Sequence, residues 1–216
     1  MIKSLRLFIM AFVALSLSAC SSMYYSGLEK IGIPKREIMV HRVEKARDSQ
    51  QDAKEQFKTT LEQFSALTQF KGGDLEAVYK KLNSEYEASK DEAAAVSKRI
   101  ADIEDVSEAL FAEWADEAEQ FSTASLRRNS LQKLAVTKQQ YNKLINAMHR
   151  AEAKMAPVLA IFKDQVLLLK HSLNAQAIAS LKNDLASVES DVNTLIKAMN
   201  DSINEADDFI KTMEKN

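Results

Sequence analysis

The amino-acid sequence predicts an all-α protein, built as an elongated antiparallel bundle of three to four long, coiled-coil-like helices. Only four glycines and two prolines occur in 216 residues, whereas a sheet protein needs turn residues every ~8 to 12 positions. Apolar residues recur at steps of three, four and seven over long stretches, which indicates helices packed against partner helices. The breaks between these stretches are short, so consecutive helices should run antiparallel.

The N-terminus has the pattern of an export signal followed by a membrane anchor. Lys3 and Arg6 precede an apolar run at 7–17, which is shorter than the ~20 residues of a membrane-spanning helix. The only cysteine, Cys20, follows in the segment LSAC, which resembles the lipobox of bacterial lipoproteins. By that resemblance residues 1–19 are removed, and Cys20 carries acyl chains that hold the protein on a membrane.

An ordinary cleaved signal is the alternative for Cys20, which would then be a free thiol in an oxidising compartment. Leu17 disfavours this alternative, because an ordinary cleavage site requires a small residue there. Lipoproteins retained in the inner membrane of two-membraned bacteria usually carry Asp directly after the cysteine, whereas this chain has Ser21. We therefore expect the protein at the outer membrane, on its periplasmic face.

The mature chain divides into a lipidated N-terminus and tether at 20–35 and a helical bundle domain at 36–216. Pro34, at the end of the tether, suits the first turn of a helix because it has no N–H to satisfy. The segment KGGD separates the first two helices, and its Asp74 can cap the second. The helices are predicted at 36–70, 75–121, 125–173 and 176–213.

The last of these helices has the most regular apolar pattern. Its apolar side chains recur with a spacing near 3.5 residues, which predicts one continuous buried seam. The residues of this seam are Ile178, Leu181, Leu185, Val188, Val192, Leu195, Met199, Ala206, Phe209 and Met213.

Charge patterning suggests which helices pair. Residues 101–121 contain eight acidic side chains and no Lys or Arg, whereas 122–155 contain seven basic side chains and the single acid Glu152. Folding the chain back near Ser122 would place the acidic arm beside the basic one. The alternative is two solvated faces, because each exposed pair contributes only ~0 to 1 kcal/mol. The basic side chains are Arg127, Arg128, Lys133, Lys138, Lys143, Arg150 and Lys154.

The turn between the second and third predicted helices is a candidate contact surface. The second helix is roughly 12 residues longer than the first, so this turn should overhang the first helix by ~18 Å and point back toward the membrane. A mixture of aromatic and basic side chains near the turn suits contact with a membrane or a partner. The alternative is that the aromatic residues pack in the core. These side chains are Phe111, Trp114, Phe121, Arg127 and Arg128.

No catalytic, cofactor or metal site is evident in the sequence. His149 and Glu152 have the reversed order of the Glu-x-x-His motif of di-iron bundles, and no second motif accompanies them. His41 and His171 lie in charged surroundings, in MVHRVEK and LLKHSLN, and are expected to cap or solvate helix ends. No serine lies in a Gly-x-Ser-x-Gly turn, and no phosphate-binding loop occurs. The formal net charge of -2 provides no basic field for nucleic acid. We expect no enzyme activity, no cofactor, no metal and no nucleic-acid partner.

Pro157 lies inside the third predicted helix, where it removes a backbone hydrogen bond and clashes with the carbonyl of Ala153. It either bends this helix around its neighbours or splits it into two. A kink could also open a groove between helices for an apolar ligand or lipid, and this alternative function stays open. Self-association is open as well, because several apolar residues lie off the main stripes: Leu61, Phe70, Val106 and Leu131.

Three segments of the chain resemble a bacterial lipoprotein family known as domain of unknown function 2959. They are KREIMVHRVEKARDSQQDAKEQF at 35–57, FKGGDLEAVYKKLNSEYE at 70–87 and MAPVLAIFKDQVLLLKHSLNAQAI at 155–178. The resemblance implies a periplasmic, helical, lipid-anchored protein and supplies no catalytic residue. With the anchor and the missing chemistry, it favours a structural or interaction protein with a partner in the cell envelope.

Overall fold

Four long helices make up most of the described chain. The computed structural model describes Tyr25, Leu28 and residues 32–70, 72–172 and 174–215. Within these residues there is no strand. Each helix begins and ends within two residues of its predicted bounds, which confirms the all-α prediction. The helices are α2 (Lys35–Thr68), α3 (Leu75–Glu119), α4 (Ala124–His171) and α5 (Ala175–Lys215).

Side chains in the turns determine where two of the helices begin. The Asp74 carboxylate accepts hydrogen bonds from the backbone N–H groups of Glu76 at 2.9 Å and Ala77 at 3.2 Å, so it caps α3 as predicted. Asn174 accepts a bond from the N–H of Ala177 at 3.0 Å and does the same for α5. In the α2–α3 turn, Gly73 has a φ of 133°, a conformation that L side chains rarely adopt, so this turn requires glycine.

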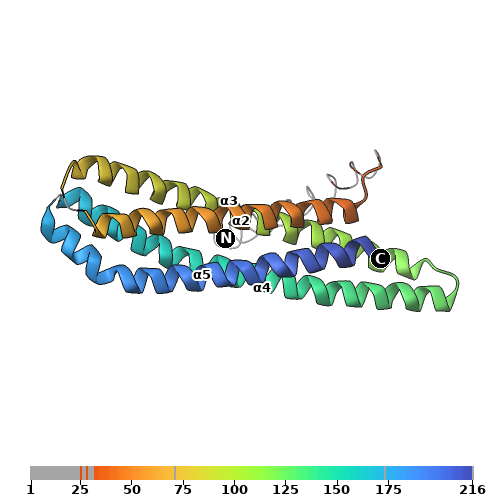
Figure 1. The fold of residues 1–216 in the computed structure, drawn as a ribbon. Coiled ribbons are helices and arrows are strands. Elements are labelled where there is room, and N and C mark those ends of the chain that lie inside the picture. The colour runs from red at the N-terminus through yellow and green to blue at the C-terminus, as the bar shows by residue number, and fades with distance from the viewer. Residues whose placement is uncertain (1–24, 26–27, 29–31, 71, 173, 216) are drawn as a thin grey trace, which may run out of the picture.

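The helices form an antiparallel bundle in which each one packs against two neighbours (Figure 1). Helices α3 and α4 each pack against the preceding helix, and α5 packs against both α4 and α2, which closes the bundle. The α3–α4 hairpin extends beyond the start of α2 (Figure 1). This overhang follows from helix length, because α3 has 45 residues and α2 has 34.

The predicted apolar seams form one continuous core through the bundle. Within it Phe57 of α2 and Phe162 of α4 stack with ring centroids 6.1 Å apart, although these helices lie diagonally across the bundle. Helix α4 continues through Pro157 without a break, so the alternative of two separate helices is wrong. The off-stripe residues lie in this core or pack against it and provide no argument for a second copy: Leu61, Phe70, Val106 and Leu131.

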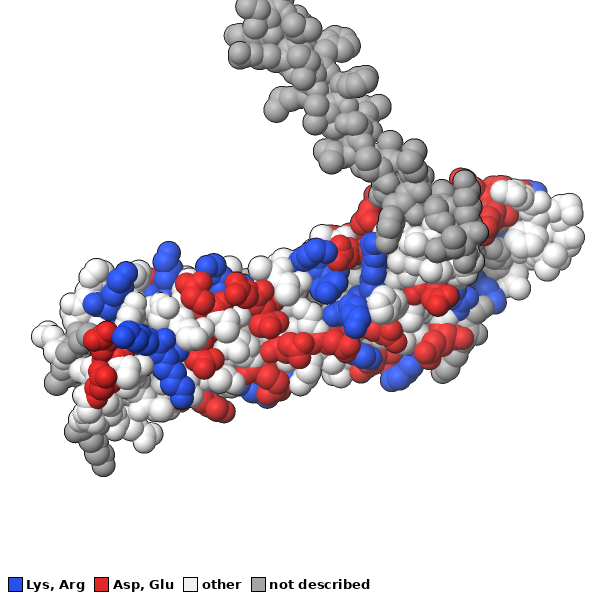
Figure 2. Space-filling model, turned by 90° about the horizontal axis from the view of Figure 1, so that it is seen from above, with Lys and Arg blue, Asp and Glu red and all other residues white. Residues whose placement is uncertain are grey.

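The predicted pairing of acidic and basic arms holds only in small part among the described residues. Of the seven basic side chains, Arg127 alone forms an ion pair with the acidic arm, to Glu119 at 3.6 Å. Other acids of α3 pair toward α2: Glu113 contacts Lys35 at 2.9 Å, and Asp105 contacts Arg42. Exposed ion pairs are weak, so the apolar seam sets the register of the helices. The flanks carry mixed charge (Figure 2).

Candidate functional site

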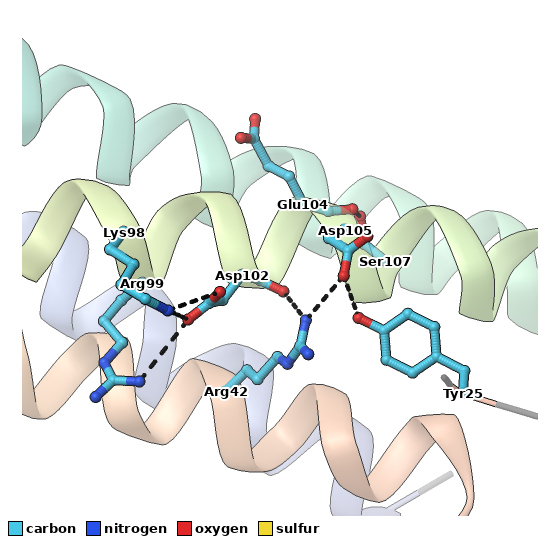
Figure 3. Close-up of polar contacts among 8 residues, drawn as sticks. All are labelled: Tyr25, Arg42, Lys98, Arg99, Asp102, Glu104, Asp105 and Ser107. Carbon is cyan, nitrogen blue, oxygen red and sulfur yellow. Dashed lines mark hydrogen bonds and ion pairs between the residues drawn. The ribbon is translucent and has the colours of Figure 1, made fainter. Parts of the chain in front are cut away.

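Tyr25 attaches the chain that leads into α2 to the side of the bundle. We call this part of the chain, residues 25–34, the N-terminal approach. The Tyr25 side chain is fully buried, and its hydroxyl donates a hydrogen bond to the Asp105 carboxylate of α3. The Arg42 guanidinium of α2 lies 5.3 Å from the centre of the Tyr25 ring. Figure 3 shows Tyr25 and Arg42 pointing toward the same carboxylate. We call the three residues Tyr25, Arg42 and Asp105 the tyrosine clamp.

The Tyr25 hydroxyl stays protonated in the tyrosine clamp. Burial and the hydrogen bond to Asp105 raise the pKa of Tyr25, so its hydroxyl remains a donor at ordinary pH. Arg42 donates to the Asp102 backbone carbonyl and lies 3.3 Å from the Asp105 carboxylate. The clamp therefore combines a buried ring, a cation–π contact and charge-assisted hydrogen bonds.

Cys20, the predicted lipidation site, lies outside the described residues, as does the predicted signal at 1–19. Tyr25 follows Cys20 by five positions. The tether at 20–35 was expected to be a spacer, and sequence reasoning did not identify Tyr25 as a contact. The tether contains several apolar and aromatic residues, so no sequence signal distinguishes Tyr25 from its neighbours.

The five residues predicted at the overhanging turn fall into two groups. Phe111 is 8% exposed and makes an edge-on contact with Tyr141, with ring centroids 5.4 Å apart. Trp114 is half-buried, and its indole N–H donates to the Ser130 hydroxyl at 3.0 Å. Phe111 and Trp114 thus belong to the packing of α3 against α4.

The other three residues lie at the end of the hairpin, which we call the α3–α4 tip (residues 120–128). Phe121 is 41% exposed, and Arg128 is exposed as well. Arg127 donates to the Phe121 carbonyl at 3.0 Å. Leu126, which sequence reasoning did not single out, is 51% exposed at the same end of the bundle. The tip therefore presents two large apolar side chains to solvent.

A groove lies between α3 and α4 close to Pro157. It has a volume of about 620 Å³, and half of the side chains that line it are small. Ala153 is one of the lining residues. Its backbone carbonyl receives no helical hydrogen bond, because the residue four positions later is Pro157, which has no N–H. Lys90, His149 and Glu152 are charged or titratable groups of the lining. The small lining residues are Ala93, Ala94, Ser97, Ala153 and Ala156.

His149 links α3 and α4 at this groove. Its Nε2 lies 2.9 Å from Glu104 of α3 and its Nδ1 lies 3.0 Å from Glu152 of α4. Hydrogen bonds to Glu104 and Glu152 raise the pKa of His149. No group of three or more His, Cys, Asp or Glu side chains suited to a metal ion occurs among the described residues.

Comparison with known proteins places the chain in a family. In the part of the chain that the structure describes, no helix is both long and apolar enough to cross a membrane. No curated protein and no solved structure matches the chain. The family described as "Protein of unknown function (DUF2959)" matches residues 24–213. Because this match covers nearly all of the helical chain, the protein belongs to that family.

Proposed function

We propose that this protein is a lipid-anchored structural or interaction protein of the bacterial cell envelope, held at the periplasmic face of the outer membrane by acyl chains on Cys20. The observation that carries the proposal is the tyrosine clamp, because Tyr25 is fully buried on the bundle only five positions after Cys20. An anchor at Cys20 would hold the bundle close to the membrane. The leader and the LSAC segment supply the anchor in this proposal.

The surface of the bundle suits a role in binding. Its core is filled by apolar side chains, and the face seen in Figure 2 carries both acidic and basic residues along much of the bundle. Mixed charge of this kind favours specific docking over nonspecific attraction. A partner protein of the envelope would therefore meet the sides of an elongated helical rod.

Incorporation of radiolabelled palmitate tests the anchor. Wild-type protein should be labelled and should fractionate with the outer membrane, whereas Cys20→Ser should be unlabelled and missing from the outer-membrane fraction. Ser22→Ala is the matched control, because it changes a neighbouring residue and leaves LSAC intact. Labelling of Cys20→Ser, or soluble wild-type protein, would overturn the proposal.

A second candidate function is binding of an apolar ligand or lipid in the α3–α4 groove near Pro157. The observation that favours it is the 620 Å³ groove, half of whose lining side chains are small, since ligand sites are typically concave and of ~300 to 1,000 Å³. Native mass spectrometry of the full-length protein released from detergent should then show a bound small molecule. Ala153→Leu should remove it, and Ala160→Leu, at an exposed position outside the groove, should not.

A further inference from the structure

The tyrosine clamp limits how far the bundle can lie from Cys20. Five Cα steps separate Cys20 from Tyr25, which span at most ~18 Å. The Tyr25 hydroxyl donates a hydrogen bond to Asp105 of α3. From Asp105, α3 continues to Glu119, which is a length of ~21 Å at the helical rise. If Cys20 is at the membrane surface and the α3–α4 tip points toward it, the tip reaches the lipid.

The opposite orientation does not fit the same limit. From Asp105 back to the start of α3 at Leu75 the helix measures ~45 Å. With that end toward the membrane, an anchor within ~18 Å of Tyr25 would submerge much of the charged flank in lipid. The α3–α4 tip is therefore the end of the rod that can meet the membrane.

The surface of the α3–α4 tip suits a lipid interface. Residues 120–126, QFSTASL, carry no charged side chain, and all seven are exposed. Two of the four large exposed apolar residues of the described chain, Phe121 and Leu126, lie here. At this end of the rod, to the right in Figure 2, uncharged residues dominate the visible surface.

Arginines border this uncharged segment. Arg127 pairs with Glu119 and donates to the Phe121 carbonyl, so it neutralises an acid and holds the turn that presents Phe121. Arg128 is exposed and free to reach a phosphate headgroup while its stem contacts apolar surface. Asp116 and Glu117 are exposed one turn below the tip. Their charge restricts insertion to the headgroup region, about 5–10 Å deep.

We propose that the α3–α4 tip inserts Phe121 and Leu126 into the headgroup region of the phospholipid bilayer in which Cys20 is anchored. The tyrosine clamp sets this orientation by keeping the tether short. The inference rests on the proposed anchor at Cys20. In this inference the tip binds a lipid surface, and the bundle has one orientation relative to the membrane.

Depth-dependent quenching tests the insertion. Lipidated full-length protein is reconstituted in vesicles of phosphatidylethanolamine and phosphatidylglycerol, with an environment-sensitive NBD label at Phe121→Cys. Leu167→Cys is the matched control, since Leu167 is 39% exposed on α4 and far from the tip. The label at 121 should shift to the blue and be quenched by lipids spin-labelled near the headgroup. The label at 167 should remain in water.

Release of the tether tests the role of the clamp. In Tyr25→Ala the free tether extends to about residue 35, a reach of ~50 Å, so quenching at 121 should fall by roughly half while the protein still floats with the vesicles. Circular dichroism checks that the bundle of this variant is folded. Undiminished quenching in a folded Tyr25→Ala protein would show that the clamp does not orient the tip.

Flotation separates failure of this inference from failure of the anchor. Wild-type protein that does not float with vesicles overturns the anchor and the inference together. Wild-type protein that floats while labels at 121 and 167 are equally exposed to water overturns the insertion alone.

Discussion

The Tyr25 hydroxyl donates a hydrogen bond to the Asp105 carboxylate, which joins two segments that lie 80 positions apart in the sequence. Arg42 of α2 contacts both residues, so the clamp ties the N-terminal approach to two helices at once. Detachment of Tyr25 would expose its buried ring to water. It would also leave the Asp105 carboxylate without one of its hydrogen-bond donors. Tyr25 therefore contributes a contact between the residues before α2 and both helices.

Substitution of Tyr25 by Ala should detach the N-terminal approach and leave the bundle folded. The backbone N–H of Ile33 donates to the Leu28 carbonyl at 3.1 Å, and this bond should open when the ring is lost. Hydrogen exchange of a peptide spanning Ile33 should accelerate by at least tenfold, or ~1.4 kcal/mol.

Tyr25→Phe and Tyr79→Ala are the controls for this measurement. Tyr25→Phe keeps the ring beside Arg42 and should give an intermediate rate, whereas Tyr79→Ala removes a half-buried tyrosine near the other end of α3. Equal exchange at Ile33 in wild type and Tyr25→Ala would contradict the clamp.

The ring pair Phe57 and Phe162 should be among the most sensitive positions of the core. Both side chains are almost fully buried, so Phe→Ala at either position should lower the free energy of unfolding by ~3–5 kcal/mol. The double variant should reveal a coupling of ~0.5–1.5 kcal/mol, because the rings contact each other.

Chemical denaturation measures both quantities. Phe121→Ala is the control, since an exposed side chain should change the free energy of unfolding by no more than ~0.5 kcal/mol. Additive effects of Phe57→Ala and Phe162→Ala would show that the diagonal contact contributes no coupling.

The sequence predicted the helices well because it encodes them locally. Apolar spacing near 3.5 residues, a capping Asp74 and few turn residues each act within a short stretch, and the four helices and their order follow from them. Contacts between distant segments have no such local signal. Tyr25 and Asp105 show this, since neither residue is unusual in its own neighbourhood.

Charge was a weaker guide than apolar spacing. Glu113 and Asp105 lie in an arm that suggested pairing with α4, yet both pair with basic residues of α2. An exposed ion pair contributes little, so acidic side chains adopt whichever partner the packed helices bring near. At the tip, the sequence identified Phe121, but it could not separate this exposed residue from the buried Phe111.

Gln50 is a polar side chain in the core whose replacement should stabilise the protein. It is fully buried, and neither its amide nitrogen nor its amide oxygen has a protein hydrogen-bond partner in the described chain. A buried amide without partners is costly, so Gln50→Met should raise the free energy of unfolding by ~1–3 kcal/mol. Denaturant titration measures this change.

The neighbouring residue provides the matched control. Gln51 is exposed and donates to Glu55 at 3.1 Å, so Gln51→Met should change the free energy of unfolding by less than ~0.5 kcal/mol. A loss of stability in Gln50→Met would contradict the prediction and show that the amide has a favourable partner in solution.

His149 should make the stability of the bundle depend on pH. Glu104 of α3 and Glu152 of α4 raise the pKa of His149, and Lys90 is the basic group at the same groove. Because the folded pKa is raised above the unfolded value of ~6.5, the stabilisation is fully present below that pH and is lost as the pH rises through the folded pKa. The melting temperature of wild type should therefore exceed that of His149→Gln most near pH ~6 and least near pH ~8.5.

Removal of the main partner checks the cause of this dependence. In the wild type, Glu104 lies 2.9 Å from His149 Nε2. Glu104→Gln keeps a side chain of similar size there but removes its charge, so the pKa of His149 should fall toward its ordinary value. NMR titration of the imidazole measures this pKa. The pH at which the difference between wild type and His149→Gln disappears should fall with it. A difference in melting temperature that is the same at every pH would mean that His149 stabilises the α3–α4 contact by packing, with no contribution from its charge.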